Sequence, residues 1–318
     1  MKLGLLTSGG DAPGMNVAIR AVVRTALFHG HQIYGFKRGF LGLMNGEYLR
    51  MDSRMVGGIL ARGGTILLTA RAPEFKSEEG ILSGIKVFQN LGLDALIIIG
   101  GNGSQSGAYE LSKKGIPVMG IASTIDNDLW GTDKTIGFDT AVNNAMNAID
   151  KIRDTATSHE RVFVIEVMGR DAGFIAIHCG VAVGADEIVI PEIPYEMSQI
   201  AQKIRDAFAL GKKHFIIILA EGVERAPQFC QKLEEGFNIE SKISTLGYLQ
   251  RGGDPTYTDR FLATTFGVYA VENLIKGISG KIVGIKNNEL TLIDMKEAAG
   301  KAKTVKTELY RLTEILSI

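Results

Sequence analysis

The most chemically loaded stretch of the sequence is Ser123-Thr124-Ile125-Asp126-Asn127-Asp128, which follows the apolar run Val118 to Ile121. It places the carboxylates of Asp126 and Asp128 two residues apart, beside the hydroxyl of Thr124. One carboxylate could accept a proton from a substrate hydroxyl while the other helps to hold Mg²⁺, which is the division of labour that phosphoryl transfer needs. An isolated Asp-Asn-Asp turn is more often a structural loop. The rest of the sequence therefore has to decide between the two interpretations.

Two glycine-rich loops each join an apolar run to a helical pattern, and they run from Thr7 to Asn16 and from Ile99 to Gly107. Free N–H groups and the positive end of a helix dipole suit phosphate at such places. The first loop lacks the Gly-Lys-Ser/Thr ending of a Walker A motif, so a P-loop ATPase is disfavoured. The second misses the dinucleotide spacing by one residue, which leaves a nicotinamide enzyme as a minor alternative.

Arginines beside glycines form a further group of candidate anion-binding residues. Arg170 lies in Met168-Gly169-Arg170-Asp171-Ala172-Gly173, and Arg251 lies in Gln250-Arg251-Gly252-Gly253. Arginine binds phosphate with two parallel hydrogen bonds, and glycine lets the backbone approach the same anion. We therefore favour a phosphate role over a solvated surface charge for these two side chains.

The order of the expected elements indicates an α/β protein with mostly parallel sheets covered by helices. We expect strands at 3–7, 32–36, 94–99, 118–121, 161–167, 187–190 and 215–220. Helical patterns include 15–28, 104–114, 142–157, 197–210 and 260–276. Because ligands bind outside the carboxyl ends of parallel strands, the loops named above are where chemistry is expected.

Charge and composition exclude several classes of protein. The 318 residues include 35 basic and 35 acidic side chains, so the formal net charge is zero and we expect no general attraction to nucleic acid or to a membrane surface. The two cysteines, Cys179 and Cys230, lie outside any CxxC or Cys/His cluster, so a disulfide framework or zinc site has no support. The apolar runs are too short to span a bilayer. We therefore expect a cytoplasmic protein.

These motifs together resemble the bacterial-type 6-phosphofructokinases, from Lys2 to about Gly284. The segments that carry the resemblance occur in the family's order: TSGGDAPGMN, GGTxLxxAR with PEF, GG-x-GS, TIDND, GFDTA, KIRDTA with SHxR, MGRxAG, AEG and LGxxQRGG. The resemblance implies two similar three-layer α/β domains with mostly parallel sheets. It places ATP on a larger domain (1–137 and 250–300) and a sugar phosphate on a smaller one (138–249 and 301–318).

The resemblance also assigns roles to individual residues. Asp126 is the implied base toward the 1-hydroxyl of fructose 6-phosphate, Thr124 the ligand of the transferred phosphoryl, and Arg71 and Arg170 the neutralising cations. ATP is expected against Gly10, Arg71, Ala72, Gly101, Asn102, Gly103 and Ser104. The implied sugar-phosphate residues are Thr124, Asp126, Met168, Gly169, Arg170, Glu221, Tyr248 and Arg251, with Arg161 and Lys242 supplied by a neighbouring subunit of a homotetramer.

Several positions depart from the family pattern. Asn102 replaces a usual aspartate ligand of Mg²⁺, so the expected metal site consists of a weakened Asn102 together with Asp128. Lys242 and Tyr248 stand where arginine and histidine are usual, which removes one bidentate fork from the sugar-phosphate pocket. Gly103 favours ATP, because pyrophosphate enzymes typically carry aspartate there, whereas Ser123 matches neither type.

The regulatory site is altered as well. Residues matching positions that hold ADP or phosphoenolpyruvate in the family are Arg20, Arg24, Arg153, Asp186 and Lys212, but Ser53 and Leu210 replace basic residues and Gly58 an acidic one. Effector control is therefore doubtful. The sequence favours an ATP-dependent 6-phosphofructokinase with Mg²⁺ as its metal. The alternatives are a catalytically weak, ligand-binding regulatory subunit and a pyrophosphate-dependent enzyme.

Overall fold

The computed structural model describes residues 1–159, 161–306 and 308–316, and its internal contacts divide the chain into two compact units. The first unit comprises Met1–Thr140 and Arg251–Lys303, and the second comprises Ala141–Gln250 and Thr304–Ile318. Each unit is therefore built from two separate stretches of the chain. Which ligand each unit binds stays a prediction.

The first unit contains a seven-stranded sheet with the order β11-β10-β5-β4-β1-β2-β3. The strands are β1 (Lys2–Thr7), β2 (Gln32–Phe36), β3 (Tyr48–Arg50), β4 (Ala95–Gly100), β5 (Val118–Ala122), β10 (Lys281–Lys286) and β11 (Glu289–Asp294). All neighbouring pairs are parallel except β2–β3 and β10–β11 at the two edges. The central strand β4 is buried at every position, as expected for a strand covered on both faces.

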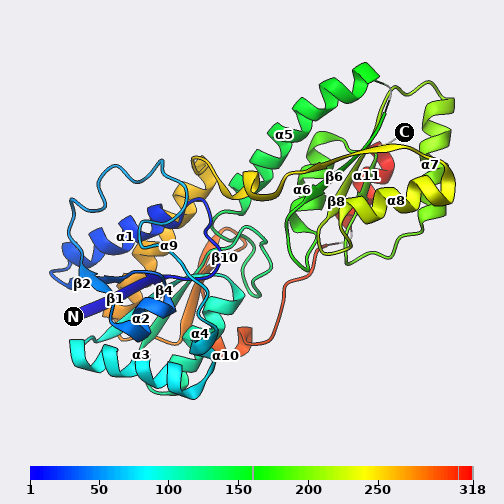
Figure 1. Cartoon of the computed structure of the whole chain (residues 1–318). Coiled ribbons are helices and arrows are strands. Elements are labelled where there is room, and N and C mark those ends of the chain that lie inside the picture. Colours follow the sequence, from blue (N-terminus) through cyan, green and yellow to red (C-terminus); the bar gives the residue numbers. More distant parts are fainter. Residues whose placement is uncertain (160, 307, 317–318) are drawn as a thin grey trace. The chain divides into compact units, whose positions relative to one another are not determined.

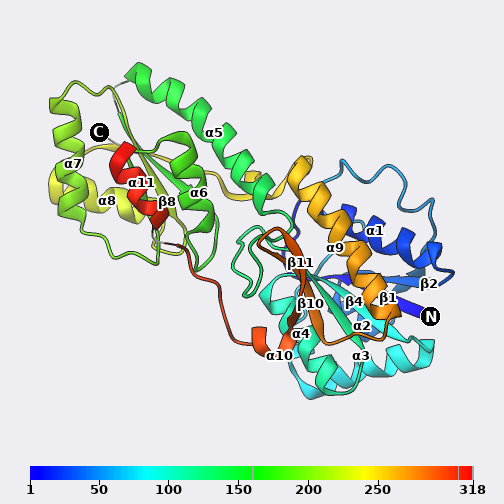
Figure 2. The same cartoon turned by 180° about the vertical axis from the view of Figure 1, so that it is seen from behind.

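Helices cover both faces of this sheet (Figures 1 and 2). On one face α1 (Met15–Phe28) packs against α9 (Tyr257–Ile275), which returns from far along the chain. On the other face lie α3 (Glu78–Leu91) and α4 (Asn102–Lys113), together with α2 (Phe40–Asn45) and the short helices η1 (Pro73–Lys76) and α10 (Met295–Ala298). The first unit is therefore a three-layer α/β sandwich.

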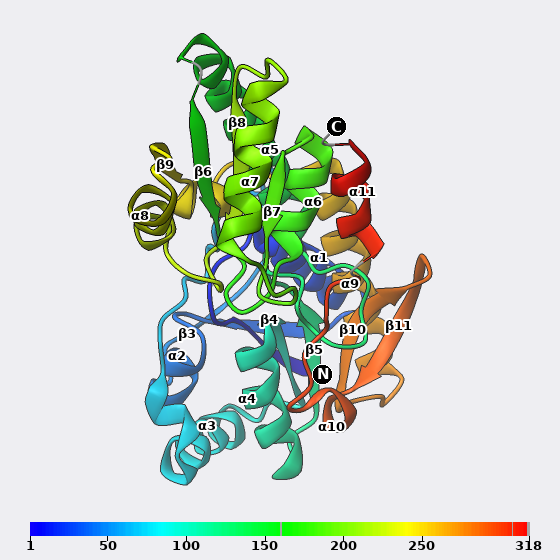
Figure 3. The same ribbon diagram turned by 90° about the vertical axis from the view of Figure 1, so that its right-hand side faces the viewer.

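The second unit contains a four-stranded, fully parallel sheet with the order β7-β8-β6-β9. Its strands are β6 (Val162–Val167), β7 (Glu187–Val189), β8 (Phe215–Ala220) and β9 (Ser241–Thr245). Its helices are α5 (Phe138–His159, which begins in the first unit), α6 (Phe174–Val183), α7 (Met197–Ala209), α8 (Ala226–Phe237) and α11 (Glu308–Leu316), and the short η2 (Gly247–Arg251) leads back to the first unit. A buried cluster joins α7 and α8 to one face of the sheet, while α6 contacts β7, β8 and α11 (Figure 3).

The α/β class with mostly parallel sheets is thus confirmed. All seven expected strands are present, with ends that differ by no more than one residue. The sequence did not reveal β3, β9, β10 and β11, because these are edge or near-edge strands with charged and half-exposed positions and no uniform apolar run. Helix α5 begins four residues earlier than the apolar periodicity indicated, at Phe138.

Within the described ranges, no helix is both long enough and apolar enough to cross a lipid bilayer.

A buried carboxylate ties α9 to the start of α5 within the first unit. Asp259 is fully buried, and its oxygens accept hydrogen bonds from the N–H of Gly137 (2.8 Å), the N–H of Thr140 (2.8 Å) and the hydroxyl of Thr140 (2.5 Å). Desolvation raises the pKa of Asp259 to about 6, although the three hydrogen bonds act in the opposite direction. The folded protein therefore binds this proton more tightly than the unfolded chain does.

We predict that this carboxyl makes the free energy of unfolding fall as pH rises from about 4 to about 6, because a raised folded-state pKa stabilises the native state only while the group is protonated. The loss should reach at most about 3 kcal/mol. Urea unfolding of the wild type and of Asp259→Asn between pH 4 and pH 8 measures it. The variant should lack this component of the pH dependence, and parallel curves for the two proteins would contradict the assignment.

Candidate functional site

The candidate site of the first unit is formed where β1, β4 and β5 end on the same edge of the seven-stranded sheet. The three strands are parallel neighbours in register, so the loops that follow them emerge side by side. The N–H of Ser8 donates to the carbonyl of Ile99 at 3.0 Å, and the N–H of Ser123 donates to that of Gly100 at 3.2 Å. The three loops that the sequence analysis singled out thus meet.

The loop after β1 turns sharply, with Gly9 at φ 84° and Gly14 at φ 102°, before α1 begins at Met15. Such positive φ values suit glycine. Gly10 is exposed and lies against the guanidinium of Arg251, with which a Cβ at position 10 would collide. Arg251 also donates to the carbonyl of Asp11 at 2.9 Å. Arg251 therefore belongs to the first unit and contacts the glycine loop that follows β1.

The segment that carries Arg71 and Ala72 is tied to this loop by side chains that the sequence analysis did not single out. Asn16 is buried; its Nδ2 donates to the carbonyls of Arg62 and Gly63, and its Oδ1 accepts from the N–H of Ile66 at 2.8 Å. Thr69 Oγ1 donates to the carbonyl of Gly9 at 2.6 Å. The exposed Arg71 follows Thr69 by two residues, so it emerges beside the glycine loop.

The loop after β4 leads directly into α4, and few side chains surround the N-terminus of this helix. Gly101 is the N-cap without a side-chain cap bond, and Gly103 is exposed with open space where a side chain would begin. Ser104 is 3% exposed, and its Oγ has no hydrogen-bond partner among the described residues. A Cβ added at Gly9 would lie 3.2 Å from that Oγ, so this hydroxyl faces the first glycine loop. Backbone N–H groups and one hydroxyl are thus presented together at a helix N-terminus, which suits phosphate.

Gln105 of helix α4 holds this edge of the sheet together. The sequence showed only a polar residue in a helix at this position. The side chain is 5% exposed, and its Nε2 donates to the carbonyls of Gly100 at 3.0 Å and Ile121 at 3.2 Å. It therefore links the ends of β4 and β5 and holds their loops together.

The loop after β5 contains the carboxylates. Asp126 is 2% exposed; its N–H donates to Thr124 Oγ1 at 3.2 Å, and that hydroxyl donates to Asp126 Oδ2 at 3.3 Å. Thr124 also lies beside the second loop, since a Cβ at Gly101 would be 3.1 Å from Thr124 Cβ. Asp126 is thus a buried carboxylate held next to a hydroxyl and next to the glycine-rich loop of α4.

Asn127 and Thr135 hold this loop in place. Asn127 adopts φ 52°, and its Oδ1 accepts from the N–H of Thr135 at 3.0 Å. The hydroxyl of Thr135 donates to the carbonyl of Thr124 at 2.6 Å. The middle residue of the Asp-Asn-Asp segment is therefore structural.

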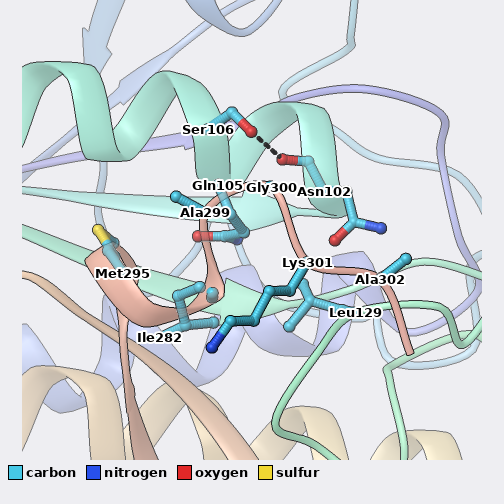
Figure 4. A pocket seen from close by; sticks show the side chains of 11 residues that line it. Asn102, Gln105, Ser106, Leu129, Ile282, Met295, Ala299, Gly300, Lys301 and Ala302 are labelled. Atoms are coloured by element: carbon cyan, nitrogen blue, oxygen red, sulfur yellow. Dashed lines mark hydrogen bonds between the residues drawn. The ribbon is translucent and has the colours of Figure 1, made fainter. Parts of the chain in front are cut away.

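Asn102 and Asp128 lie next to each other, as expected for a shared site. Asn102 Nδ2 donates to the backbone carbonyl of Asp128 at 3.4 Å, and the N–H of Lys303 donates to the same carbonyl at 2.9 Å. Asn102 also borders a cavity of about 250 Å³ between the first turn of α4 and the segment 298–302 (Figure 4). There Ser106 Oγ donates to the carbonyl of Asn102 at 2.9 Å, and Lys301 crosses the opening.

The candidate site of the second unit lies at the carboxyl ends of β6 and β8. Glu221 Oε1 accepts from the N–H of Gly169 at 3.2 Å and from that of Arg170 at 3.0 Å. Gly169 at φ 146° and Arg170 at φ 52° form the turn that makes this possible. The structure therefore brings Met168, Gly169, Arg170 and Glu221 together, and Met168, Glu221 and the 83% exposed Tyr248 line one cavity of about 180 Å³.

Glu166 and Arg225 border the same cavity and were not singled out from the sequence. Glu166 is 4% exposed, accepts from Arg225 at 2.9 Å and accepts from the N–H of Ala226 at 2.8 Å. These contacts raise the pKa of Arg225, chiefly through its hydrogen bond to Glu166. The pair fixes the start of α8 beside the cavity.

Arg161 and Lys242 are not part of this group. Both line another cavity, of about 520 Å³, at the amino ends of β6 and β9. Lys242 Nζ donates to Glu240 Oε1 at 2.5 Å, which holds the pKa of Glu240 below its usual range. In a single chain, these two cations are thus separated from Met168 and Arg170 by the length of β6.

The expected effector residues form two groups, one in each unit. Arg20 and Arg24 lie on α1, where burial and then the charge of Arg24 lower the pKa of Arg20. In the second unit Asp186 pairs with Lys212, and Arg153 donates to the carbonyl of Val183. His214 sits among these groups, and its pKa is lowered first by burial. The sequence analysis did not single out this histidine.

Comparisons with known proteins agree with this geometry. Residues 2–274 match the family described as Phosphofructokinase. Two curated relatives, the ATP-dependent 6-phosphofructokinases of Bacillus velezensis and of Bacillus subtilis, are each 51% identical over 317 residues, covering 100% of this chain and 99% of theirs. The solved structure of phosphofructokinase from Saccharomyces cerevisiae is 34% identical with a TM-score of 0.86, and the match covers 94% of this chain and 45% of the yeast chain. The chain belongs to the phosphofructokinase family.

Proposed function

We propose that this chain is an ATP-dependent 6-phosphofructokinase of glycolysis. It transfers the γ-phosphoryl group of ATP to the 1-hydroxyl of fructose 6-phosphate and gives fructose 1,6-bisphosphate and ADP. The observation that carries the proposal is the buried Asp126, held beside Thr124 and the glycine-rich loop of α4 in a chain that matches enzymes of this name over its whole length. We infer ATP and not pyrophosphate as donor, because Gly103 leaves open space at the mouth of that loop.

In the first unit, Gly10, Arg71, Ala72 and the segment 101–104 bind ATP in this proposal. Phosphoryl transfer leaves little covalent work to the protein, so positioning and neutralisation of charge dominate. The N–H groups of the two glycine loops supply fixed dipoles, Ser104 Oγ is available as a donor, and Arg71 supplies a mobile positive charge at the edge of the loop. Thr124 orients the transferred group beside Asp126, and Asp126 accepts the proton of the sugar hydroxyl.

In the second unit, Met168, Gly169, Arg170 and Glu221 bind the sugar phosphate. The two N–H groups of the 169–170 turn are held by one oxygen of Glu221, so the turn is preorganised before the ligand arrives. Arg170 is exposed at the tip of that turn and neutralises phosphate charge. Tyr248 of this unit and Arg251 of the first unit complete the proposed sugar-phosphate residues.

Arg161 and Lys242 serve the site of a neighbouring copy of the chain. Arg161 precedes β6 and Met168 follows it, so at the usual rise of a parallel strand they lie roughly 23 Å apart. This is longer than a hexose phosphate, and one ligand cannot contact both ends of the strand. We infer a homo-oligomer, a tetramer as the family resemblance implies, in which one copy completes the site of another.

Mg²⁺ fits the first unit as an ion that arrives with the nucleotide. Asp128 offers one carboxylate and Asn102 one neutral amide oxygen, and the described residues hold no cluster of three or more His, Cys, Asp or Glu side chains that could bind a metal by themselves. Mg²⁺ is commonly held by one or two carboxylates together with substrate phosphates and water. Bound there, it would offset negative charge on the phosphates.

A second candidate function rests on Asn102. The neutral side chain beside Asp128 weakens a metal site, which would suit a regulatory subunit with little turnover.

One assay separates these functions: purified protein, fructose 6-phosphate and Mg²⁺ are mixed with ATP, with pyrophosphate or with neither. We expect turnover with ATP. Turnover with pyrophosphate alone, or no turnover with either donor, would overturn the proposal. Control by ADP or phosphoenolpyruvate and the cytoplasmic location stay predictions.

Replacing the proposed base should affect the chemical step. Asp126→Ser is expected to lower kcat by about a hundredfold to ten-thousandfold, the usual contribution of general base catalysis, while the KM for fructose 6-phosphate changes little. Steady-state kinetics check this, with Asp133→Ser, a nearby aspartate without a proposed catalytic role, as the control. Wild-type kcat in Asp126→Ser would remove Asp126 from the reaction.

Asn102→Asp should strengthen the metal site. A second carboxylate within reach of the ion adds one charge-assisted contact, which is worth about 1.5 to 3 kcal/mol and hence about tenfold to a hundredfold in affinity. Activity titrated with Mg²⁺ should therefore saturate at lower concentration in the variant. Superimposable titration curves would mean that Asn102 does not bind the metal and only contacts the backbone of Asp128 from the first turn of α4.

Two inactive variants should complement each other if the site is shared between copies. Asp126→Ser and Arg161→Met each damage a different copy's contribution, so a mixed oligomer contains some sites with both native residues. After the two proteins are dissociated together and reassembled, turnover should exceed that of either protein reassembled alone. If the mixture stays as inactive as its components, with subunit exchange shown by mass spectrometry, the shared site is wrong.

A further inference from the structure

The largest cavity described for the second unit is the one that contains Arg161 and Lys242. Its volume is about 520 Å³, and the residues that line it are Arg161, Val162, Ile204, Arg205, Phe208, Asn238, Ile239, Glu240 and Lys242. It is contained within this unit, between the amino ends of β6 and β9, helix α7 and the end of α8. Arg205 is a third cation here, and neither the motifs nor the proposed function assigned it a role.

The charge of the lining matches a phosphate monoester. Arg161, Arg205 and Lys242 supply three positive charges against the single carboxylate of Glu240 among the described lining residues, which leaves a net charge of two. A phosphate monoester carries about −1.5 to −2 near pH 7. Without Arg205, half of the net positive charge would be lost.

The three cations differ in the hydrogen bonds they can offer. Lys242 is a point charge that already donates to Glu240 at 2.5 Å, so its charge is partly engaged within the protein. Arginine presents five N–H donors in a planar fork that matches phosphate oxygens. Arg205 uses one such group in a 3.3 Å contact with Gln202 Oε1, which leaves the other donors for a ligand.

The backbone that carries Arg205 is firmly held. Its neighbour Ile204 is 2% exposed and belongs to the same buried cluster as Val162, while Phe208 and Ile239 pack against that cluster. The apolar part of the cavity is therefore the edge of the core, and the cations lie at its rim. When Arg205 binds an anion, only its side chain has to be ordered, because its backbone is already held.

We propose that Arg205 is a phosphate-binding residue that acts with Arg161 and Lys242 and determines the affinity for the 6-phosphate of the sugar bound at a neighbouring copy's site. The proposal rests on the proposed function and extends it to a residue outside the recognised motifs. Arg205 supplies the second fork in a cavity where Lys242 offers only a point charge.

The test separates binding from chemistry. In Arg205→Met the KM for fructose 6-phosphate should rise about tenfold with kcat nearly unchanged, because one charge-assisted contact to the phosphate is lost. Inhibition by inorganic phosphate, competing with fructose 6-phosphate, should weaken by a similar factor. Arg205→Lys should recover part of the affinity, since it restores the charge and not the fork. The matched control is Arg311→Met, an exposed arginine on α11 in the same unit, which should leave both values unchanged.

A double-mutant comparison tests whether Arg205 and residue 242 share one ligand. Lys242→Arg adds a fork to the same cavity, so the KM penalty of Arg205→Met should be smaller in that background than in the wild type. Equal penalties in both backgrounds would show that the two side chains do not act on one phosphate and would overturn the shared role.

The outcomes distinguish this proposal from the function on which it rests. An unchanged KM in Arg205→Met, together with the loss of turnover in Arg161→Met, would reject Arg205 and leave the shared site standing. Turnover that is absent in the wild type would reject the function itself. A fall in kcat equal to the rise in KM would indicate a structural effect and would also count against a phosphate contact.

Discussion

The parallel direction of neighbouring strands is the constraint on which the candidate sites of both units depend. Because β1, β4 and β5 run the same way in register, their carboxyl ends reach one edge and their loops contact each other. In the second unit, β6 and β8 deliver the 168–173 turn and Glu221 to one edge for the same reason. An antiparallel strand in either place would send one of these loops to the opposite edge, and the anion-binding groups would be dispersed.

Polar side chains inside the fold convert this arrangement into a fixed geometry. Asn16 binds the segment before Arg71, Gln105 joins β4 to β5, and Glu221 holds two N–H groups of the 169–170 turn. Each is buried or half-buried and contacts backbone groups, so each replaces hydrogen bonds that the loops would otherwise make with water. Positioning is most of what phosphoryl transfer asks of a protein, and these side chains contribute to it by holding the loops in place.

Strand β6 also separates Arg161 from Arg170, although the sequence analysis assigned both to the sugar phosphate. Arg170 follows β6 and Arg161 precedes it, so the strand itself keeps them apart. The cavity around Arg161 then has its own lining, in which Arg205 from α7 joins Lys242 from β9. In the proposed function, a second copy of the chain is needed because the proposed phosphate-binding side chains lie at opposite ends of one sheet.

The sequence by itself determined the α/β class, seven strands with apolar runs and the loops that carry Gly10, Asn102 and Asp126, because buried parallel strands are short apolar runs and glycine marks the turns after them. It also gave the family through motifs such as TIDND. It did not give the edge strands β3, β9, β10 and β11, whose half-exposed positions lack a clear pattern. The roles of Asn16, Gln105 and Arg205 were decided only by tertiary structure. Their partners lie far away in the chain or on another element, and no local spacing records a contact that depends on how helices pack against a sheet.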